Sequence, residues 1–264
     1  MALANRLGII VGGLGGIGSV TANLLRSRGT KLALLYAPLE SERVRPVLKD
    51  IFDTEPESSS DIKAYECDIT SANSVQDAFD AIASDNTAFP SILVNTAGYV
   101  SLHPFETFPT DEVLMHYNIN LLGPTLTAQA FARLYFQSAE ANRAKAPGGR
   151  IVNIASQAAH VALNHHGPYC ASKAGLLGLT KCMASEWGPR GITANTVSPG
   201  PVMTALGRKA WGDPTLSEPY LAGVPTGQFA EPMEVARIVE FLCSDGARNV
   251  NGADVRLDGG FTIR

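Results

Sequence analysis

The stretch VGGLGGIG, Val11 to Gly18, holds five glycines in eight residues near the beginning of the chain. A mostly apolar run, residues 7–11, leads into it, and another, residues 17–25, follows it. Because glycine weakens strands and helices alike, so many glycines between the two indicate that bare backbone is needed there. Such a turn lets the backbone approach a phosphate group closely, and the N–H groups that begin the helix then hold the anion.

The spacing of these glycines narrows the choice of anion. It reads Gly12-x-x-x-Gly16-x-Gly18, and a looser Gly-x-Gly-x-x-Gly starts at Gly13. A strand before the turn and a helix after it are the context that dinucleotide binding requires. The Lys-Ser/Thr pair of a nucleotide-hydrolysing P-loop is absent, so the pattern favours a dinucleotide over ATP.

Short β-like runs alternate with amphipathic stretches along the chain. The β-like runs are 7–11, 31–36, 62–67, 91–95, 150–155, 191–197 and 253–258, and the amphipathic stretches are 17–28, 41–53, 71–84, 110–138, 169–187 and 231–243. This alternation predicts an α/β fold, a doubly wound parallel sheet of about seven strands with helices on both faces. We expect residues 1–264 to form a single domain. Residues 199–226 follow a strand and are rich in Pro, Gly and large apolar side chains, so we expect a substrate loop there.

Composition excludes several classes of function. The net charge of −4 and the lack of a basic block argue against nucleic acid as a partner. No apolar run approaches the roughly 20 residues that span a bilayer, and the N-terminus lacks a signal peptide's apolar core, so we expect a cytoplasmic protein without membrane contact. The four cysteines are scattered along the chain, so we expect free thiols. The adjacent His165 and His166 have no third ligand at useful spacing, so we expect no metal.

Further motifs follow the glycine turn in a fixed order. They are CDIT (67–70), NTAG (95–98), NLLG (120–123), IVNIAS (151–156), YCASK (169–173), SPGPVMT (198–204) and VRLDGG (255–260). Together they span nearly the whole chain, and the ordered set resembles the short-chain dehydrogenase/reductase family in its short, single-domain branch. The resemblance implies a Rossmann-type fold and an NAD(P)-dependent oxidoreductase that acts on CH–OH or C=O groups.

Two residues of the YCASK motif form a candidate acid–base pair. Tyr169 and Lys173 are four residues apart on a predicted helix and therefore share one face. A free tyrosine has a pKa of about 10, and a nearby ammonium group lowers it toward the working pH. The resemblance implies that Tyr169 transfers a proton to or from the substrate oxygen, while Ser156 stabilises that oxygen. It further implies that Lys173 holds the nicotinamide ribose and that Asn120 supports a water that relays protons to Lys173.

The resemblance, together with the residues at and after the end of the second predicted strand, suggests a set of cofactor contacts. They are Gly12, Gly16, Ile17, Gly18, Tyr36, Ser41, Arg43, Asp68, Ile69, Asn95, Ala97, Gly98, Tyr169, Lys173, Pro199, Gly200, Val202 and Thr204. An NAD enzyme usually ends its second strand with an acid that binds the ribose diol, and Tyr36 stands there instead. Because Ser41 and Arg43 could bind a 2′-phosphate, NADPH is the preferred cofactor. NADH stays an alternative cofactor, because Glu40 and Glu42 are acidic and the glycine turn has no basic residue.

One position departs from the family pattern beside the glycine turn. Val11 stands where a threonine is common, so a hydroxyl hydrogen bond to the NTAG segment is lost. The loss costs about 1 kcal/mol. The hydroxyl of Thr96 could offset part of it.

Residues flanking the catalytic set are candidates for substrate binding. They are Tyr99, His160, Leu163, Met203 and Trp211, with Val100, His165, His166, Leu206 and Tyr220 nearby. Large apolar and aromatic groups suit a medium-sized, partly hydrophobic carbonyl compound. We therefore expect reversible, NADPH-dependent reduction of a ketone to a secondary alcohol.

Three other functions remain open on the same scaffold. They are an NAD-dependent alcohol dehydrogenase, a cofactor-binding protein without turnover, and an enzyme of another reaction such as dehydration. The resemblance further implies a homotetramer or homodimer that pairs residues 110–138 and 169–187.

Overall fold

Seven parallel strands form the centre of the molecule. The computed structural model describes residues 3–53, 61–141 and 146–263. The strands are β1 (Arg6–Val11), β2 (Lys31–Tyr36), β3 (Ile62–Glu66), β4 (Phe89–Asn95), β5 (Gly149–Ile154), β6 (Ile192–Pro199) and β7 (Asp254–Leu257). They pair in the order β3-β2-β1-β4-β5-β6-β7, each parallel to its neighbour. The predicted doubly wound parallel sheet is thus confirmed, with strand ends that lie within two residues of the expected ones.

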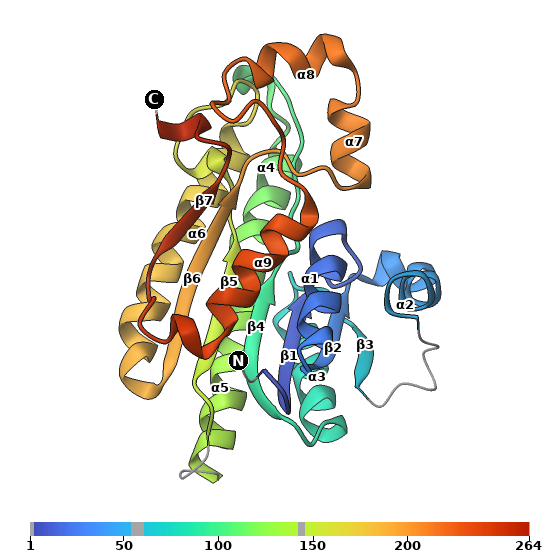
Figure 1. Cartoon of the computed structure of the whole chain (residues 1–264), viewed down its shortest axis with the longest axis vertical. Coiled ribbons are helices and arrows are strands. Elements are labelled where there is room, and N and C mark those ends of the chain that lie inside the picture. The colour runs from blue at the N-terminus through green and yellow to red at the C-terminus, as the bar shows by residue number, and fades with distance from the viewer. Residues whose placement is uncertain (1–2, 54–60, 142–145, 264) are drawn as a thin grey trace.

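Helices cover both faces of this sheet (Figure 1). On one face lie α1 (Gly16–Ser27), α2 (Val44–Phe52) and α9 (Pro232–Cys243), and on the other lie α3 (Ala72–Asp85), α4 (Thr110–Tyr117), α5 (Gly123–Ala141) and α6 (Gly167–Trp187). Each face has its own core: Ile10 packs with Leu25 and Val239 on the first, and Ile151 packs with Phe131 on the second. Strands buried on both faces read as continuous apolar runs, and for this reason they were visible in the sequence.

The strand order reverses at β1, which has β2 on one side and β4 on the other. The connections after β1 and β4 therefore leave the sheet in opposite directions and open a crevice at the carboxyl ends of the strands. The glycine turn lies at this point, where the N–H groups of Gly12 and Gly13 donate to the Leu35 carbonyl at 2.9 and 3.1 Å.

The helix expected over residues 110–138 is interrupted. A π-helical turn, Asn118–Leu122, joins α4 to α5, and the N–H of Gly123 reaches back five residues to the Asn118 carbonyl. Pro124 has no N–H and cannot continue a regular ladder of hydrogen bonds, which accounts for the wider turn.

The segment expected as a loop, residues 199–226, contains two short helices, α7 (Ala205–Trp211) and α8 (Pro214–Leu221). Each begins with a side-chain cap: the Thr204 hydroxyl accepts the Gly207 N–H at 3.1 Å, and the Asp213 carboxylate accepts the Thr215 N–H at 2.9 Å. Both helices lie beyond the carboxyl ends of the strands (Figure 1). The segment is therefore a helical wall beside the crevice and not an irregular loop.

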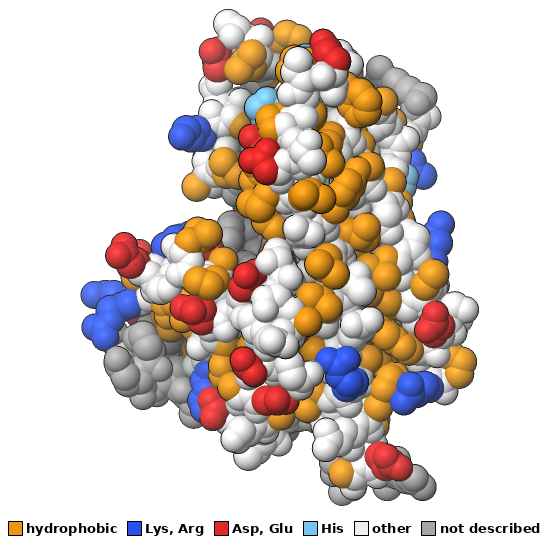
Figure 2. Space-filling model, turned by 180° about the vertical axis from the view of Figure 1, so that it is seen from behind, with side chains coloured by type: hydrophobic (Ala, Val, Ile, Leu, Met, Phe, Trp, Pro, Cys, Tyr) orange, Lys and Arg blue, Asp and Glu red, His pale blue; other side chains and the backbone are white. Residues whose placement is uncertain are grey.

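The side of the molecule turned away from the viewer of Figure 1 carries exposed apolar side chains. Figure 2 shows hydrophobic side chains gathered on the face turned away from the viewer of Figure 1. Leu114 on α4 and Leu122 in the π-helical turn are 54% and 39% exposed. Within residues 3–53, 61–141 and 146–263, no helix combines the length and apolarity that crossing a membrane demands.

Candidate active site

A cavity of about 700 Å³ opens at the carboxyl ends of the strands. Ten of the predicted cofactor residues line it: Gly12, Gly16, Ile17, Gly18, Tyr36, Asp68, Ile69, Ala97, Gly98 and Thr204. Its wall also contains neighbours of these residues in the same motifs, Val11, Gly15, Cys67, Thr70 and Thr96, together with Leu35, Ala37, Pro38, Leu39, Glu40, Met115, Ile119 and Leu206. The sequence motifs for the glycine turn, the β3 end and the β4 end thus converge on one space.

The glycine turn forms one wall of this cavity with bare backbone. Gly12 has a φ of +75°, a conformation that favours glycine. A β-carbon on Gly18 would lie 2.2 Å from the Gly12 carbonyl oxygen, so neither position has room for a side chain. Gly15 precedes α1 and supplies no side-chain cap, which leaves the helix N-terminus to an external anion. This cradle fits the pyrophosphate of a dinucleotide.

Thr96 secures the turn against β4. Its hydroxyl donates to the Val11 carbonyl at 2.6 Å and lies 3.2 Å from the Gly12 carbonyl. The hydroxyl predicted to offset the loss at Val11 therefore does bond to the end of β1.

Ser156, Tyr169 and Lys173 lie together on the other side of the strand reversal. Ser156 follows β5, its hydroxyl accepts the Ala158 N–H at 3.1 Å, and the same hydroxyl acts on the pKa of the Tyr169 phenol. The Lys173 Nζ, on α6, lies 5.9 Å from the centroid of the Tyr169 ring and donates to the Ile154 carbonyl at 2.8 Å. Because the Ser156 oxygen already accepts one hydrogen bond, its own hydrogen is free to point at the phenol oxygen.

Burial controls the titration of this group. It raises the pKa of Tyr169, and the Ser156 hydroxyl opposes that rise. Burial also lowers the pKa of Lys173 to about 8. The sequence predicted that Lys173 would lower the pKa of Tyr169, whereas in the protein alone the loss of hydration is the larger effect on the phenol.

Asn120 occupies the middle of the π-helical turn and is buried. Its Oδ1 accepts the Tyr99 N–H at 2.8 Å, and its Nδ2 donates to the Tyr99 carbonyl at 2.9 Å and the Ser172 hydroxyl at 3.0 Å. A β-carbon on Gly98 would lie 3.6 Å from Asn120 Oδ1 and 3.7 Å from Lys173 Nζ, so both polar groups lie close to Gly98. Asn120 thus fixes the strand-to-helix connection after β4, and the proton relay to Lys173 stays a prediction.

Two predicted phosphate contacts have other partners. The guanidinium of Arg43 pairs with Glu40 and donates to the Leu14 carbonyl at 2.9 Å. The Ser41 hydroxyl hydrogen-bonds the Pro38 carbonyl and lies 3.3 Å from a carboxylate oxygen of Glu66. Neither side chain lines the cavity.

Six more predicted cofactor residues lie outside the cavity wall: Asn95, Tyr169, Lys173, Pro199, Gly200 and Val202. The Asn95 side chain faces the core, where it donates to Asn153 at 2.8 Å and accepts from the Thr127 hydroxyl at 2.9 Å. Its side chain therefore holds β4 to β5 and α5.

The predicted substrate residues are spread over several elements. The Tyr99 hydroxyl lies 3.3 Å from Glu112, and the Trp211 ring packs on Tyr220 with centroids 4.7 Å apart. His160 lies 2.9 Å from the Asp254 carboxylate at the start of β7, so the structure gives its ring a partner outside the cavity. Met203 and Leu163 contribute backbone hydrogen bonds to the segments beside α7 and before α6.

Sequence reasoning missed Gln157, the residue after Ser156. It is buried, and its Nε2 donates to the Tyr220 hydroxyl at 2.6 Å. Its Oε1 has no hydrogen-bond partner among the described residues and lies 3.1 Å from where a β-carbon on Gly200 would be. A buried acceptor without a partner beside Ser156 is a candidate contact for a substrate hydroxyl.

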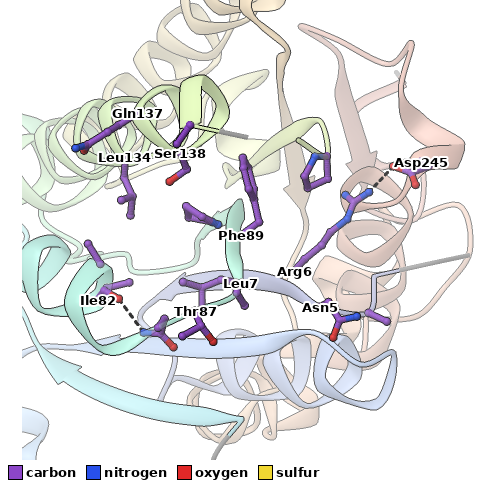
Figure 3. A pocket seen from close by; sticks show the side chains of 17 residues that line it. Asn5, Arg6, Leu7, Ile82, Thr87, Phe89, Leu134, Gln137, Ser138 and Asp245 are labelled. Carbon is purple, nitrogen blue, oxygen red and sulfur yellow. Dashed lines mark hydrogen bonds and ion pairs between the residues drawn. The ribbon is translucent and has the colours of Figure 1, made fainter. Parts of the chain in front are cut away.

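A second cavity, of about 780 Å³, lies at the amino ends of β1 and β4 (Figure 3). Arg6 turns toward Asp245 there and pairs with it at 2.5 Å. The wall contains none of the predicted site residues.

Comparison with known proteins gives a consistent picture. The chain matches the family model described as enoyl-(acyl carrier protein) reductase over residues 12–262. It is 38% identical over 262 residues to D-threitol dehydrogenase of Mycolicibacterium smegmatis. The aligned residues cover 99% of this chain and 95% of that protein. It is 33% identical over 264 residues to NAD-dependent glycerol dehydrogenase of Listeria innocua, with 99% and 96% covered. A variant of a Serratia marcescens short-chain dehydrogenase/reductase superposes with a TM-score of 0.85 at 29% identity, over 99% of this chain and 100% of that one.

Proposed function

We propose that the protein interconverts a small polyol and its ketone. The chain belongs to the short-chain dehydrogenase/reductase family and is an NAD(P)-dependent oxidoreductase of CH–OH and C=O groups, and the proposal starts from that membership. One observation carries the catalytic part of this proposal: the Lys173 ammonium lies 5.9 Å from the centroid of the Tyr169 ring, and the Ser156 hydroxyl lowers the pKa of the same phenol. This is a proton donor, an oxyanion partner and a positive charge in one place.

The chain's own residues handle the proton. Because burial raises the pKa of Tyr169, the phenol keeps its proton near neutral pH and donates it to the ketone oxygen during reduction. Ser156 donates a hydrogen bond to the same oxygen and stabilises its developing charge. The Lys173 charge favours the phenolate when the alcohol is oxidised. When bound, the nicotinamide supplies or accepts the hydride.

A polyol fits the polar part of the site. The Gln157 Oε1 is a buried acceptor that lacks a protein partner among the described residues, and a substrate hydroxyl beside the reacting carbon can donate to it. The Trp211 and Tyr220 rings, which suggested a partly hydrophobic substrate, pack on each other and on Phe229, so much of their surface serves the fold. The D-threitol and glycerol dehydrogenases are named for small polyols as well.

The test is cofactor turnover with a panel of polyols and keto-sugars, with NAD and NADP in parallel. We expect the wild type to reduce one oxidised cofactor with some polyol, and Tyr169→Phe to lose the activity by a factor of about 10³ or more. Tyr117→Phe, at an exposed position on α4, is the matched control and should keep full activity. Conversion of substrate with the cofactor unchanged would instead identify another reaction on this fold.

We also propose that the protein works in the cytoplasm as a homotetramer or homodimer. The exposed apolar side chains of Leu114 and Leu122 lie on the helices that the resemblance assigns to subunit pairing. Sedimentation velocity should show an oligomer at micromolar concentration, and a stable monomer would contradict this.

A further inference from the structure

A carboxylate folds back onto the turn that follows β2. The turn is a 3₁₀ helix, Pro38–Arg43, and Glu40 at its third position accepts the Ala37 N–H at 3.3 Å. The Glu40 side chain is 18% exposed and lines the cavity at the carboxyl ends of the strands, here called the main cavity, beside Tyr36 and Ala37. The N–H at the start of this turn, a natural donor to an anion, is therefore taken by a carboxylate of the chain itself.

The nearby cation is neutralised in the same way. Arg43 pairs with Glu40 through Nη1 and donates through Nη2 to the Leu14 carbonyl at 2.9 Å. Its donors are thus directed at the chain and away from the space where a 2′-phosphate would enter. Arg43 therefore has partners in the chain itself where the sequence suggested a phosphate contact.

A second carboxylate approaches from the neighbouring strand. Glu66 ends β3 directly beside Tyr36 in the β2–β3 register, and it lies 3.3 Å from the Ser41 hydroxyl. Tyr36, its register partner, lines the cavity, and burial and, after it, the charge of Glu66 raise the pKa of Tyr36. In the turn and the end of β3 beside it, the carboxylates of Glu40, Glu42 and Glu66 outnumber the one guanidinium of Arg43.

We propose that Glu40 takes the place of the acid missing at Tyr36 and selects the dinucleotide without a 2′-phosphate, NAD(H). Its carboxylate accepts a hydrogen bond from the adenosine ribose diol, and with Glu66 it repels a 2′-phosphate, which carries about −1.5 to −2 charges at neutral pH. The inference rests on the proposed function only in requiring that the main cavity binds a nicotinamide dinucleotide. It reverses the preference for NADPH that Tyr36, Ser41 and Arg43 suggested in the sequence.

The experiment measures binding to the full chain without substrate. Dissociation constants for NADH and NADPH come from the fluorescence of the bound nicotinamide, and competition by ADP and 2′,5′-ADP isolates the adenosine end. We expect the wild type to bind NADH at least about tenfold more tightly than NADPH, and Glu40→Gln to shrink that ratio about tenfold. The glutamine keeps an oxygen for the Ala37 N–H, so the turn should persist, which an unchanged melting temperature verifies.

Matched variants separate the contributions. Glu42→Gln removes an exposed charge of the same turn that does not line the cavity and should leave the ratio unchanged. Glu66→Gln should shrink the ratio by a smaller factor than Glu40→Gln, because Glu66 lies outside the cavity wall. A larger effect at Glu66, or an equal one at Glu42, would overturn the assignment to Glu40.

The outcomes also distinguish this inference from the proposed function. Preference for NADPH together with polyol turnover would overturn the role of Glu40 and leave the function standing. Preference for NADH without turnover of any alcohol or ketone would support the role of Glu40 and count against the function. Failure of both dinucleotides to bind would overturn both.

Discussion

The Thr96 hydroxyl donates a 2.6 Å hydrogen bond to the carbonyl oxygen of Val11, which joins the end of β4 to the end of β1 where the connections diverge. Where a threonine occupies position 11, as is common in the family, the hydroxyl that joins these two strand ends belongs to the end of β1. In this chain the hydroxyl belongs to Thr96, after β4, so the two strand ends are still joined by a side-chain hydrogen bond.

Replacement of this hydroxyl should weaken the fold. Thr96→Val keeps the shape but leaves the Val11 carbonyl without this donor, and we expect the free energy of unfolding to fall by about 1 kcal/mol. Thr96→Ser retains the hydroxyl and should remain within a few tenths of the wild type. Urea denaturation of the three proteins measures the difference, and equal stability of all three would show that the bond contributes nothing net.

The glycine turn should tolerate no side chain at Gly18. A methyl group there would lie 2.2 Å from the Gly12 carbonyl oxygen, so the backbone must move and the cradle is distorted. Gly18→Ala should weaken dinucleotide binding by at least about tenfold, which is 1.4 kcal/mol. Gly178→Ala, where an added β-carbon meets nothing within 4 Å, should leave the affinity unchanged. Titration with NADH compares the two, and equal affinities would contradict the cradle.

Substrate recognition should depend on Gln157. Gln157→Leu removes the unpartnered Oε1 and should raise the KM for the best polyol roughly tenfold. The same change should affect a simple secondary alcohol much less, because that substrate has no neighbouring hydroxyl. Steady-state kinetics with both alcohols provides the test. An equal rise in KM for the two would mean that Gln157 only shapes the site.

Lys173 should make stability depend on pH in a defined direction. Its pKa falls from an ordinary value of 10.5 to about 8 in the folded protein, so between these values the folded chain binds fewer protons than the unfolded one. The free energy of unfolding should therefore rise from about pH 8 to about pH 10.5 and be lowest below pH 8. Lys173→Met lacks this contribution.

The comparison isolates Lys173 from other groups that titrate. The difference in unfolding free energy between wild type and Lys173→Met should change in favour of the wild type as the pH rises through this window. Loss of the donor to the Ile154 carbonyl shifts the variant's stability by the same amount at every pH. Parallel pH profiles would show that Lys173 keeps an ordinary pKa.

Much of the fold could be predicted because it depends on local patterns. The apolar runs at β1, β4 and β5 are buried on both faces and need no partner to be recognised. The helices of 199–226 were missed because Pro and Gly are frequent there and their caps, Thr204 and Asp213, are common loop residues as well. The single-domain extent of 1–264 stays a prediction.

The candidate site was predictable where one motif carries it and not where distant segments meet. Tyr169 and Lys173 share a helix, and their closeness follows from the spacing alone. The contact of Ser41 with Glu66 joins residues 25 positions apart, and no spacing in the sequence reveals it. The pairing of Arg43 with Glu40 is local, but a sequence does not tell whether an arginine faces its own turn or a ligand.

Because of the π-helical turn at Asn118–Leu122, the geometry of the site depends on the number of residues between α4 and α5. Each residue of an α-helix turns the chain by about 100°, so the additional residue in this turn sets the angular phase of α4 relative to α5. With one residue fewer between Tyr117 and Gly123, the segment could form an unbroken helix, yet Asn120 would face another direction and lose Tyr99 and Ser172. A deletion there would therefore disable the site while every catalytic side chain is still present.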